Sequence, residues 1–249
     1  FGNFYSHELS FFLIDNNDYN NLQQIFNKCN LRIKKFISKS YIEGTLLINK
    51  LQLDTFFKIK IEKKNSQIIY FENSALKFRQ NFNFGSDMII KDISKITGLN
   101  YETIINLFKS SKFTNKKENQ ELIEKDFFTG QNYRKIKKQL IIDIAEARIK
   151  ELAEIIIDKN INTKSFRNKN TPIFLMIKDQ IVSEKLKNSL KFFFIDEKYT
   201  DKNIIKNYVS QELYDNAFNL VQFGWKKEVV PVIQEKKSII SRFFSNIFK

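Results

Sequence analysis

Three observations predict a mixed α/β fold. Strand-like runs come in pairs and triplets, segments with helical spacing of apolar residues lie between them, and 42% of the 249 residues are hydrophobic, which is enough to build a sizeable core. The length allows one large domain or two modest ones. Because strands and helices alternate along the chain, neither an all-α nor an all-β architecture is expected.

The first part of the chain alternates short strands with short helices. A helix is expected to begin at Asn16, with Leu22, Ile25 and Phe26 at helical spacing, and a turn at 72–74 is expected to join two strands. A second short helix covers 41–48. The strands are predicted over 7–14, 31–37, 55–61, 67–71 and 75–84.

The remainder, from Gly85 onward, is mostly helical. Pro172 opens a buried strand over 173–177, and a second strand is expected over 192–195. The polar stretch 110–121 indicates a linker. Helices are predicted over 88–96, 101–108, about 133–158, 183–190 and 211–224.

The last fourteen residues form the most informative segment. Wound as a helix at about 100° per residue, they place all their large apolar side chains on one side and serine, asparagine and cationic residues on the other. The segment is too short to span a bilayer, so we expect it to lie in an anionic lipid interface. The alternative is a terminal helix that docks on the core of the chain. The predicted membrane-binding residues are Ile239, Ile240, Arg242, Phe243, Phe244, Ile247, Phe248 and Lys249.

Composition narrows the remaining functional classes. The formal net charge of +14 suits a nucleic-acid partner, but the basic residues are dispersed, and no zinc-ligand spacing or RNA-binding aromatic motif accompanies them. No nucleic-acid partner or metal site is therefore expected. The single cysteine, Cys29, fits a reducing cytoplasm, and no signal peptide or apolar run of spanning length is present. Because Phe1 opens the chain, we expect a longer reading frame upstream.

Several stretches carry a family pattern in a consistent order. They are Cys29-Asn30-Leu31 after a helix, 71–78 (Phe-Glu-Asn-Ser-Ala-Leu-Lys-Phe), 85–93 (Gly-Ser-Asp-Met-Ile-Ile-Lys-Asp-Ile), 141–148 (Ile-Ile-Asp-Ile-Ala-Glu-Ala-Arg) and 214–224 before the terminal segment. This series resembles the bacterial cell-division protein family FtsA, of the actin-like ATPase superfamily. The resemblance covers nearly all of this chain but corresponds to roughly the second half of a family member.

The resemblance implies an actin-like (ribonuclease-H-like) fold, here its C-terminal lobe, followed by an amphipathic helix. It divides the chain into the end of a first lobe, a second lobe with a helical subdomain, a linker and the membrane-targeting helix. The corresponding ranges are 1–50, 51–225 with the subdomain at about 91–168, 226–235 and 236–249.

Glycines are missing where the family's ATP site needs them. The family pattern Asp-x-Gly-Gly-Gly-Thr-Thr-Asp falls on 60–67, which contains no glycine, and the second glycine-rich loop falls on 176–180, which contains none either. The helix that faces the ribose and base in the family has Ile105 and Phe108 at those places. Of the nucleotide-associated positions only Gly85 and Asp87 remain, and they also fit a turn and a helix N-cap. ATP with Mg is implied by the family alone, and we expect a degenerate, non-enzymatic relative without a cofactor.

The function implied by the resemblance is that of an adaptor that tethers FtsZ polymers to the cytoplasmic face of the cell membrane at the division site. The FtsZ C-terminal tail would contact Arg148 and Glu151, one turn apart on the long helix. The alternative for these two residues is an ordinary solvated i,i+3 pair. Self-polymerisation and other divisome partners are also implied. Another actin-like ATPase, such as a pilus-assembly protein, and a basic nucleic-acid-binding module are the alternative functions.

Overall fold

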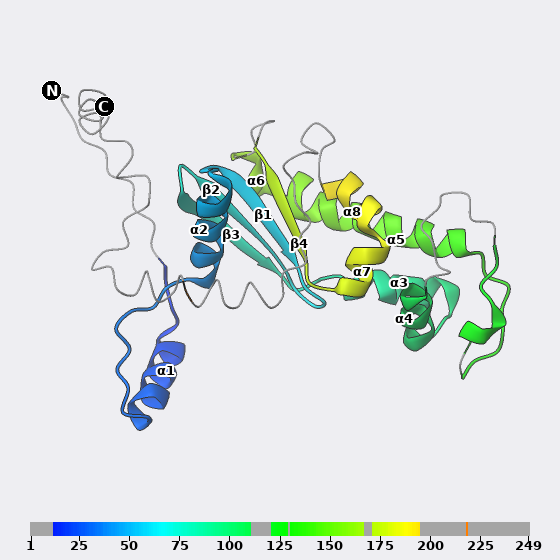
Figure 1. The fold of residues 1–249 in the computed structure, drawn as a ribbon, viewed down its shortest axis with the longest axis horizontal. Helices are drawn as coiled ribbons and strands as arrows, with labels where there is room; N and C mark the ends of the chain where they lie inside the picture. Colours follow the sequence, from blue (N-terminus) through cyan, green and yellow to red (C-terminus); the bar gives the residue numbers. More distant parts are fainter. Residues whose placement is uncertain (1–11, 111–120, 129, 167–170, 195–217, 219–249) are drawn as a thin grey trace. The chain divides into compact units, whose positions relative to one another are not determined.

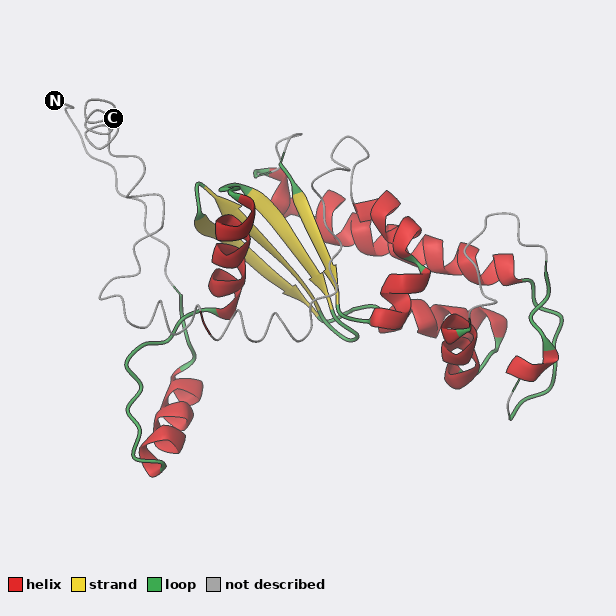
Figure 2. Cartoon of the chain, in the orientation of Figure 1, coloured by secondary structure: helices red, strands yellow, loops and turns green. Residues whose placement is uncertain are grey.

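The computed structural model describes residues 12–110, 121–128, 130–166, 171–194 and 218. These residues fall into two compact units, which are considered separately. The first contains the described parts of Phe1–Thr55, Phe71–Phe78 and Val209–Lys249, and the second those of Phe56–Tyr70 and Arg79–Tyr208. The secondary structure is mixed α/β, as predicted (Figure 2).

A four-stranded mixed sheet has the order β3-β2-β1-β4 (Figure 1). Strands β1 and β4 run parallel, with Ile59 opposite Leu175. The links from β1 to β2 and from β2 to β3 are too short for a crossover, so these neighbours run antiparallel. The strands are β1 Phe56–Ile61, β2 Ser66–Glu72, β3 Ala75–Phe82 and β4 Ile173–Ile177.

The β2–β3 hairpin confirms the predicted turn. Asn73 and Ser74 both have positive φ, 50° and 61°, as a two-residue turn between twisted strands requires. The Ser74 amide donates to the carbonyl oxygen of Asp54 at 2.7 Å. Asparagine tolerates the left-handed region better than most residues do, so the local sequence suits the turn.

The first unit contains two of the helices. Helix α1, Asn16–Lys28, begins where the carboxylate of Asp15 accepts a hydrogen bond from the Asn17 amide at 2.8 Å. Helix α2, Lys39–Leu51, stacks Tyr41 on Phe71 with ring centroids 6.3 Å apart.

The second unit holds the remaining helices, of which α5 is the longest. It packs against α3 and α8 (Figure 1). It buries Ile141, Ala145, Ile149 and Leu152, which recur at helical spacing. The elements are α3 Asp87–Thr97, α4 Tyr101–Lys109, the 3-10 helix η1 Lys125–Phe127, α5 Lys138–Ala153, the π-helix η2 Glu154–Asp158, α6 Ile161–Lys164, α7 Gln180–Lys185 and α8 Lys187–Phe194.

The prediction of a strand over 31–37 was wrong. Its residues alternate, but no strand among the described residues pairs with it, and Leu31 and Phe36 remain exposed. A strand needs a hydrogen-bonding partner for its backbone, and alternation alone does not supply one.

The predicted strand over 192–195 was also wrong in its described part. Residues 192–194 complete α8, because a helix begun at Lys187 buries Leu190 and Phe194 one turn apart. The expected helix 183–190 is instead split at Leu186 between α7 and α8.

The long helix begins five residues later than predicted. An isolated antiparallel bridge between Leu122 and Lys137 holds the preceding segment extended, and the Lys138 amide donates to the carbonyl oxygen of Glu121 at 2.9 Å. The predicted strand 7–14 lies mostly outside the described residues, as does the helix 211–224 except for Phe218, and the segment 236–249 lies wholly outside them. Among the described residues, no helix is long and apolar enough to cross a membrane.

Candidate functional site

Three segments that the family resemblance places at a nucleotide site meet in the second unit. They are the β1–β2 turn at 62–65, residues 85–87 at the start of α3, and Lys178 with Asp179 after β4. Parallel pairing of β1 with β4 brings the first and third together, and the Lys178 amide donates to the carbonyl oxygen of Ile61 at 2.9 Å. The three segments therefore lie together in the second unit.

Gly85 is fixed by close packing against the β1–β2 turn. A Cβ at this position would lie 2.0 Å from the carbonyl oxygen of Glu62 and 2.7 Å from that of Lys63. Carbon and oxygen atoms do not approach so closely, and the obstructing atoms belong to backbone that cannot rotate away. Glycine at position 85 thus has a structural cause that involves no ligand.

The backbone donors that follow Gly85 are directed at the same turn. The Ser86 amide donates to the Glu62 carbonyl at 3.0 Å, and the Asp87 amide donates to the Lys63 carbonyl at 2.9 Å. An anion-binding loop needs N–H groups that point at the ligand. Here both N–H groups are used inside the protein.

Asp87 lies in the first turn of α3 and is paired with its neighbours. Its carboxylate forms an ion pair with Lys91 at 3.0 Å and accepts a hydrogen bond from the Tyr101 hydroxyl at 3.2 Å. Burial, followed by the charge and hydrogen bond of Asp87, raises the pKa of Tyr101 above its ordinary value. Asp87 thus stabilises the start of α3 and its contact with α4.

Glu62 occupies the turn between β1 and β2 and is held by two lysines. Its carboxylate lies 3.2 Å from the Lys60 amine and 3.5 Å from the Lys178 amine. Burial raises the pKa of Glu62, but the hydrogen bonds and charges of Lys60 and Lys178 outweigh burial, and the pKa is lowered. The side chain is therefore an ionised carboxylate where the family resemblance places a phosphate-binding glycine.

Asp179 joins the third segment to the other two. Its carboxylate accepts a hydrogen bond from the Ser86 hydroxyl at 3.1 Å and another from the Val182 amide at 3.3 Å, which caps α7. Asp179 is buried, so both bonds are shielded from water. The sequence reasoning missed this residue, although an Asp three residues before Val182 and directly before a helix is an N-cap signal.

Phe108 lies on α4, the helix that the family resemblance places at the ribose and base. Its ring is among the largest fully buried side chains, in the core of the second unit. A residue with no exposed surface cannot contact a ligand. Among the described residues, no group of three or more His, Cys, Asp or Glu side chains is arranged to hold a metal ion.

Arg148 and Glu151, the residues predicted to contact FtsZ, are close together but already paired. The Arg148 guanidinium lies 2.8 Å from the Glu151 carboxylate, and its Nε donates to the carboxylate of Asp92 on α3. The Arg148 side chain is 20% exposed and that of Glu151 50%. Arg148 therefore ties α5 to α3, a role that the helical spacing of 148 and 151 alone did not reveal.

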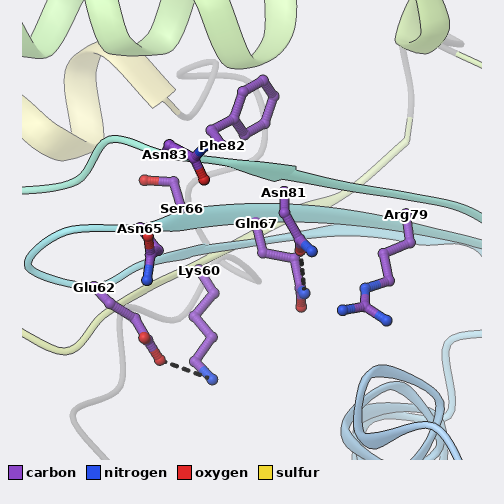
Figure 3. Close-up of a pocket in the computed structure, with 9 residues that line it drawn as sticks. All are labelled: Lys60, Glu62, Asn65, Ser66, Gln67, Arg79, Asn81, Phe82 and Asn83. Carbon is purple, nitrogen blue, oxygen red and sulfur yellow. Dashed lines mark hydrogen bonds and ion pairs between the residues drawn. The ribbon is translucent and has the colours of Figure 1, made fainter. Parts of the chain in front are cut away.

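A polar pocket of about 340 Å³ opens on the sheet beside this convergence (Figure 3). Lys60, Gln67 and Arg79 project to the same side of the sheet, and the Gln67 amide donates to the Asn81 side-chain oxygen at 2.7 Å. Sequence reasoning missed the pocket because its residues come from three strands. The lining residues are Lys60, Glu62, Asn65, Ser66, Gln67, Arg79, Asn81, Phe82 and Asn83.

Comparison with known proteins finds similarity in structure only. No protein-family model matches the sequence. No curated protein matches it either. MreB5 of Spiroplasma citri bound to ADP matches at 12% identity over 86% of this chain and 69% of that chain, with a TM-score of 0.54. The ethanolamine utilization protein EutJ from Carboxydothermus hydrogenoformans matches at 9% identity over 74% of this chain, with a TM-score of 0.44.

The chain spans 53% of the length of EutJ and 69% of that of MreB5. The likeness to MreB5 extends over most of this chain. At 12% identity the likeness establishes architecture and nothing about ligands. The fold of this chain is therefore actin-like, as that of MreB5 is.

Proposed function

We propose that this chain is part of an FtsA-like adaptor that tethers FtsZ filaments to the cytoplasmic face of the cell membrane at the division site, without ordinary ATP hydrolysis. The observation that carries the proposal is the amphipathic sequence 236–249 in a chain with an actin-like fold. Its apolar face contains only isoleucine and phenylalanine, and four cations accompany it without an acid.

The packed loops support a role without catalysis. The amides of Ser86 and Asp87 donate to carbonyl oxygens of the β1–β2 turn, and Glu62 places negative charge there. A nucleotide phosphate at this turn would meet a carboxylate and two amides that are already hydrogen-bonded. An adaptor needs the fold and its binding surfaces but not the phosphate chemistry.

The proposed FtsZ contact uses the exposed end of the Arg148 pair. Glu151 is half exposed and can rotate into water, whereas Asp92 holds the guanidinium from the other side. A carboxylate of the FtsZ tail would then replace Glu151 at the guanidinium, and Glu151 would become available to a basic residue of the same tail. Binding exchanges one ion pair for another, so we expect modest affinity from this contact.

The strength of the membrane anchor can be bounded. Three phenylalanines and three isoleucines half-buried in the interface provide several kcal/mol at about 25 cal/mol per Å². Each nearby cation adds about 1 kcal/mol on an anionic surface. One copy would therefore bind reversibly, and assembly into polymers would make attachment stable.

Sedimentation with anionic liposomes tests the anchor. The full chain should pellet with the vesicles, whereas a chain that ends at Glu235 should stay in solution. A matched variant, Phe243→Ser with Phe244→Ser, keeps every cation and removes only apolar area, so it should also stay in solution. If the full chain and both variants all stay in solution, or all three pellet equally, the proposed anchor is wrong.

Binding of an FtsZ C-terminal tail peptide tests the second contact. Arg148→Lys keeps the charge but loses the bidentate geometry, and we expect it to weaken binding about tenfold. Lys150→Gln, at an exposed position of the same helix, is the control and should bind like the wild type. Unchanged peptide affinity in Arg148→Lys and in the charge reversal Arg148→Glu would refute this assignment.

The second candidate function is that of a nucleotide-binding actin-like ATPase, such as a pilus-assembly protein. The fold's likeness to MreB5, whose structure contains ADP, favours it. This alternative predicts Mg-dependent binding of ADP, whereas the adaptor proposal predicts liposome binding that does not change with nucleotide.

A further inference from the structure

The pocket on the sheet contains more hydrogen-bond donors than its own residues use. The Gln67 amide donates to the side-chain oxygen of Asn81, which leaves the two amide hydrogens of Asn81 for another partner. Asn65 and Asn83 are exposed, and no described residue bonds to either side-chain amide. Three side-chain amides therefore line one pocket: Asn81 on β3, Asn83 just after β3, and Asn65 in the β1–β2 turn.

Arg79 adds a cation to these donors. It lies on β3, is exposed, and forms no ion pair or hydrogen bond with any described side chain. Figure 3 shows its guanidinium on the side of the sheet to which Lys60 and Gln67 also project. The planar guanidinium offers parallel N–H donors at the spacing of two oxygens on one carbon.

The charge of the lining indicates the charge of the ligand. Two cations, Lys60 and Arg79, and one carboxylate, Glu62, line the pocket, and Lys60 and Glu62 are paired at 3.2 Å. Lys178, which does not line the pocket, also pairs with Glu62, at 3.5 Å. The lining therefore carries an excess of positive charge and suits an anion, and the flat guanidinium of Arg79 matches the two coplanar oxygens of a carboxylate.

We propose that this pocket binds a small polar monocarboxylate, held by Arg79 through its carboxylate and by Asn65, Asn81 and Asn83 through its polar groups. The donor set comes from strand β3, the residue that follows it and the β1–β2 turn, and it requires neither a metal ion nor a nucleotide. The carboxylate could belong to a free hydroxy acid or to the C-terminus of a peptide, which share the same recognition chemistry. The proposal is independent of membrane attachment.

Nuclear magnetic resonance titration of the full chain tests the site with matched probes. N-acetylglycine carries a peptide group and a carboxylate, N-acetylglycinamide is its neutral equivalent, and glycolate represents a free hydroxy acid. We expect N-acetylglycine or glycolate to shift the side-chain resonances of Arg79 and Asn81 with a dissociation constant of about 1 mM. N-acetylglycinamide should shift neither, and the better of the two acids identifies the source of the carboxylate.

Three variants make the titration decisive. Arg79→Gln and Asn81→Asp should each weaken binding of the carboxylate probe at least tenfold. Lys64→Gln removes an equal charge from the β1–β2 turn at a residue that does not line the pocket, and it should change the affinity less than twofold. The proposal is overturned if Arg79→Gln binds like the wild type, if the amide binds as well as the acid, or if inorganic phosphate binds more tightly than both acids. Failure to pellet with liposomes would leave this result unaffected.

Discussion

Two turns that touch one another in the second unit have different glycine content. Residue 85, at the start of α3, is a glycine whose Cβ position is filled by backbone oxygens of the β1–β2 turn. The β1–β2 turn itself, 62–65, has no glycine and carries Glu62, Lys63, Lys64 and Asn65 instead. The resemblance places both turns at the nucleotide, yet only one of them kept the residue type.

The difference separates two physical reasons for a glycine. Position 85 must be glycine because another part of the protein occupies the space of a side chain. Positions 62–65 would need glycine only to let backbone N–H groups approach a phosphate. Packing accounts for Gly85 whether or not a ligand binds, whereas a turn without glycine at 62–65 is what the proposed loss of nucleotide binding would allow.

The largest effect should come from adding a single methyl group at the packed turn. Gly85→Ala forces a Cβ to within 2.0 Å of the Glu62 carbonyl, so we expect a loss of about 3 kcal/mol in the free energy of unfolding. Urea denaturation measures it. Gly130→Ala is the control, because its Cβ would enter open space and only its positive φ of 71° disfavours alanine, at about 1 kcal/mol. Equal losses in the two variants would show that packing does not fix Gly85.

A smaller loss is expected where α5 meets α3. Arg148→Ala leaves the partly buried Asp92 carboxylate without its cation, which should lower the free energy of unfolding by about 2 kcal/mol. Lys150 is exposed and lies two residues further along α5. Lys150→Ala should therefore change the free energy of unfolding by less than about 0.5 kcal/mol. If both variants unfold at the same urea concentration as the wild type, Arg148 does not tie the two helices together.

The smallest effect concerns the pH dependence of the charged turn. The pKa of Glu62 is lower in the folded protein than in the unfolded chain, so its stabilising contribution is complete above about pH 4.3 and is lost as the pH falls through the folded pKa. Glu62→Gln should be slightly less stable than the wild type at pH 6. Below the folded pKa of Glu62, the variant and the wild type should be equally stable. A gap between the two denaturation midpoints that stays constant from pH 6 to about pH 3 would contradict the lowered pKa.

Much of the fold was predictable from local signals. The turn at Asn73 and Ser74, the three strands around it and helices α3 and α4 were predicted close to their observed bounds, because turn chemistry and apolar periodicity act within a few residues. The errors arose where residues far away along the chain determine the secondary structure. Residues 31–37 have no described strand to pair with, and Phe192 continues a helix whose buried positions fix its phase.

The candidate site was predictable in part for the same reason. The resemblance located Gly85, Asp87 and the glycine-free turn. It did not reveal that Ser86 bonds to Asp179 or that Glu62 pairs with Lys178, partners more than 90 residues away along the chain. The Arg148–Glu151 pair follows from helical spacing, whereas its third member, Asp92, lies on another helix. The residues of the pocket are likewise assembled by strand pairing.

Calorimetric titration of the full chain with MgATP tests most directly the claim that the fold was kept and its phosphate chemistry lost. We expect no measurable heat of binding up to millimolar nucleotide in the presence of Mg²⁺. The amides of Ser86 and Asp87 are used inside the protein, and Glu62 is ionised. A saturable heat with a dissociation constant in the micromolar range would contradict it. The turn at 62–65 would then have to bind phosphate through Lys63 and Lys64.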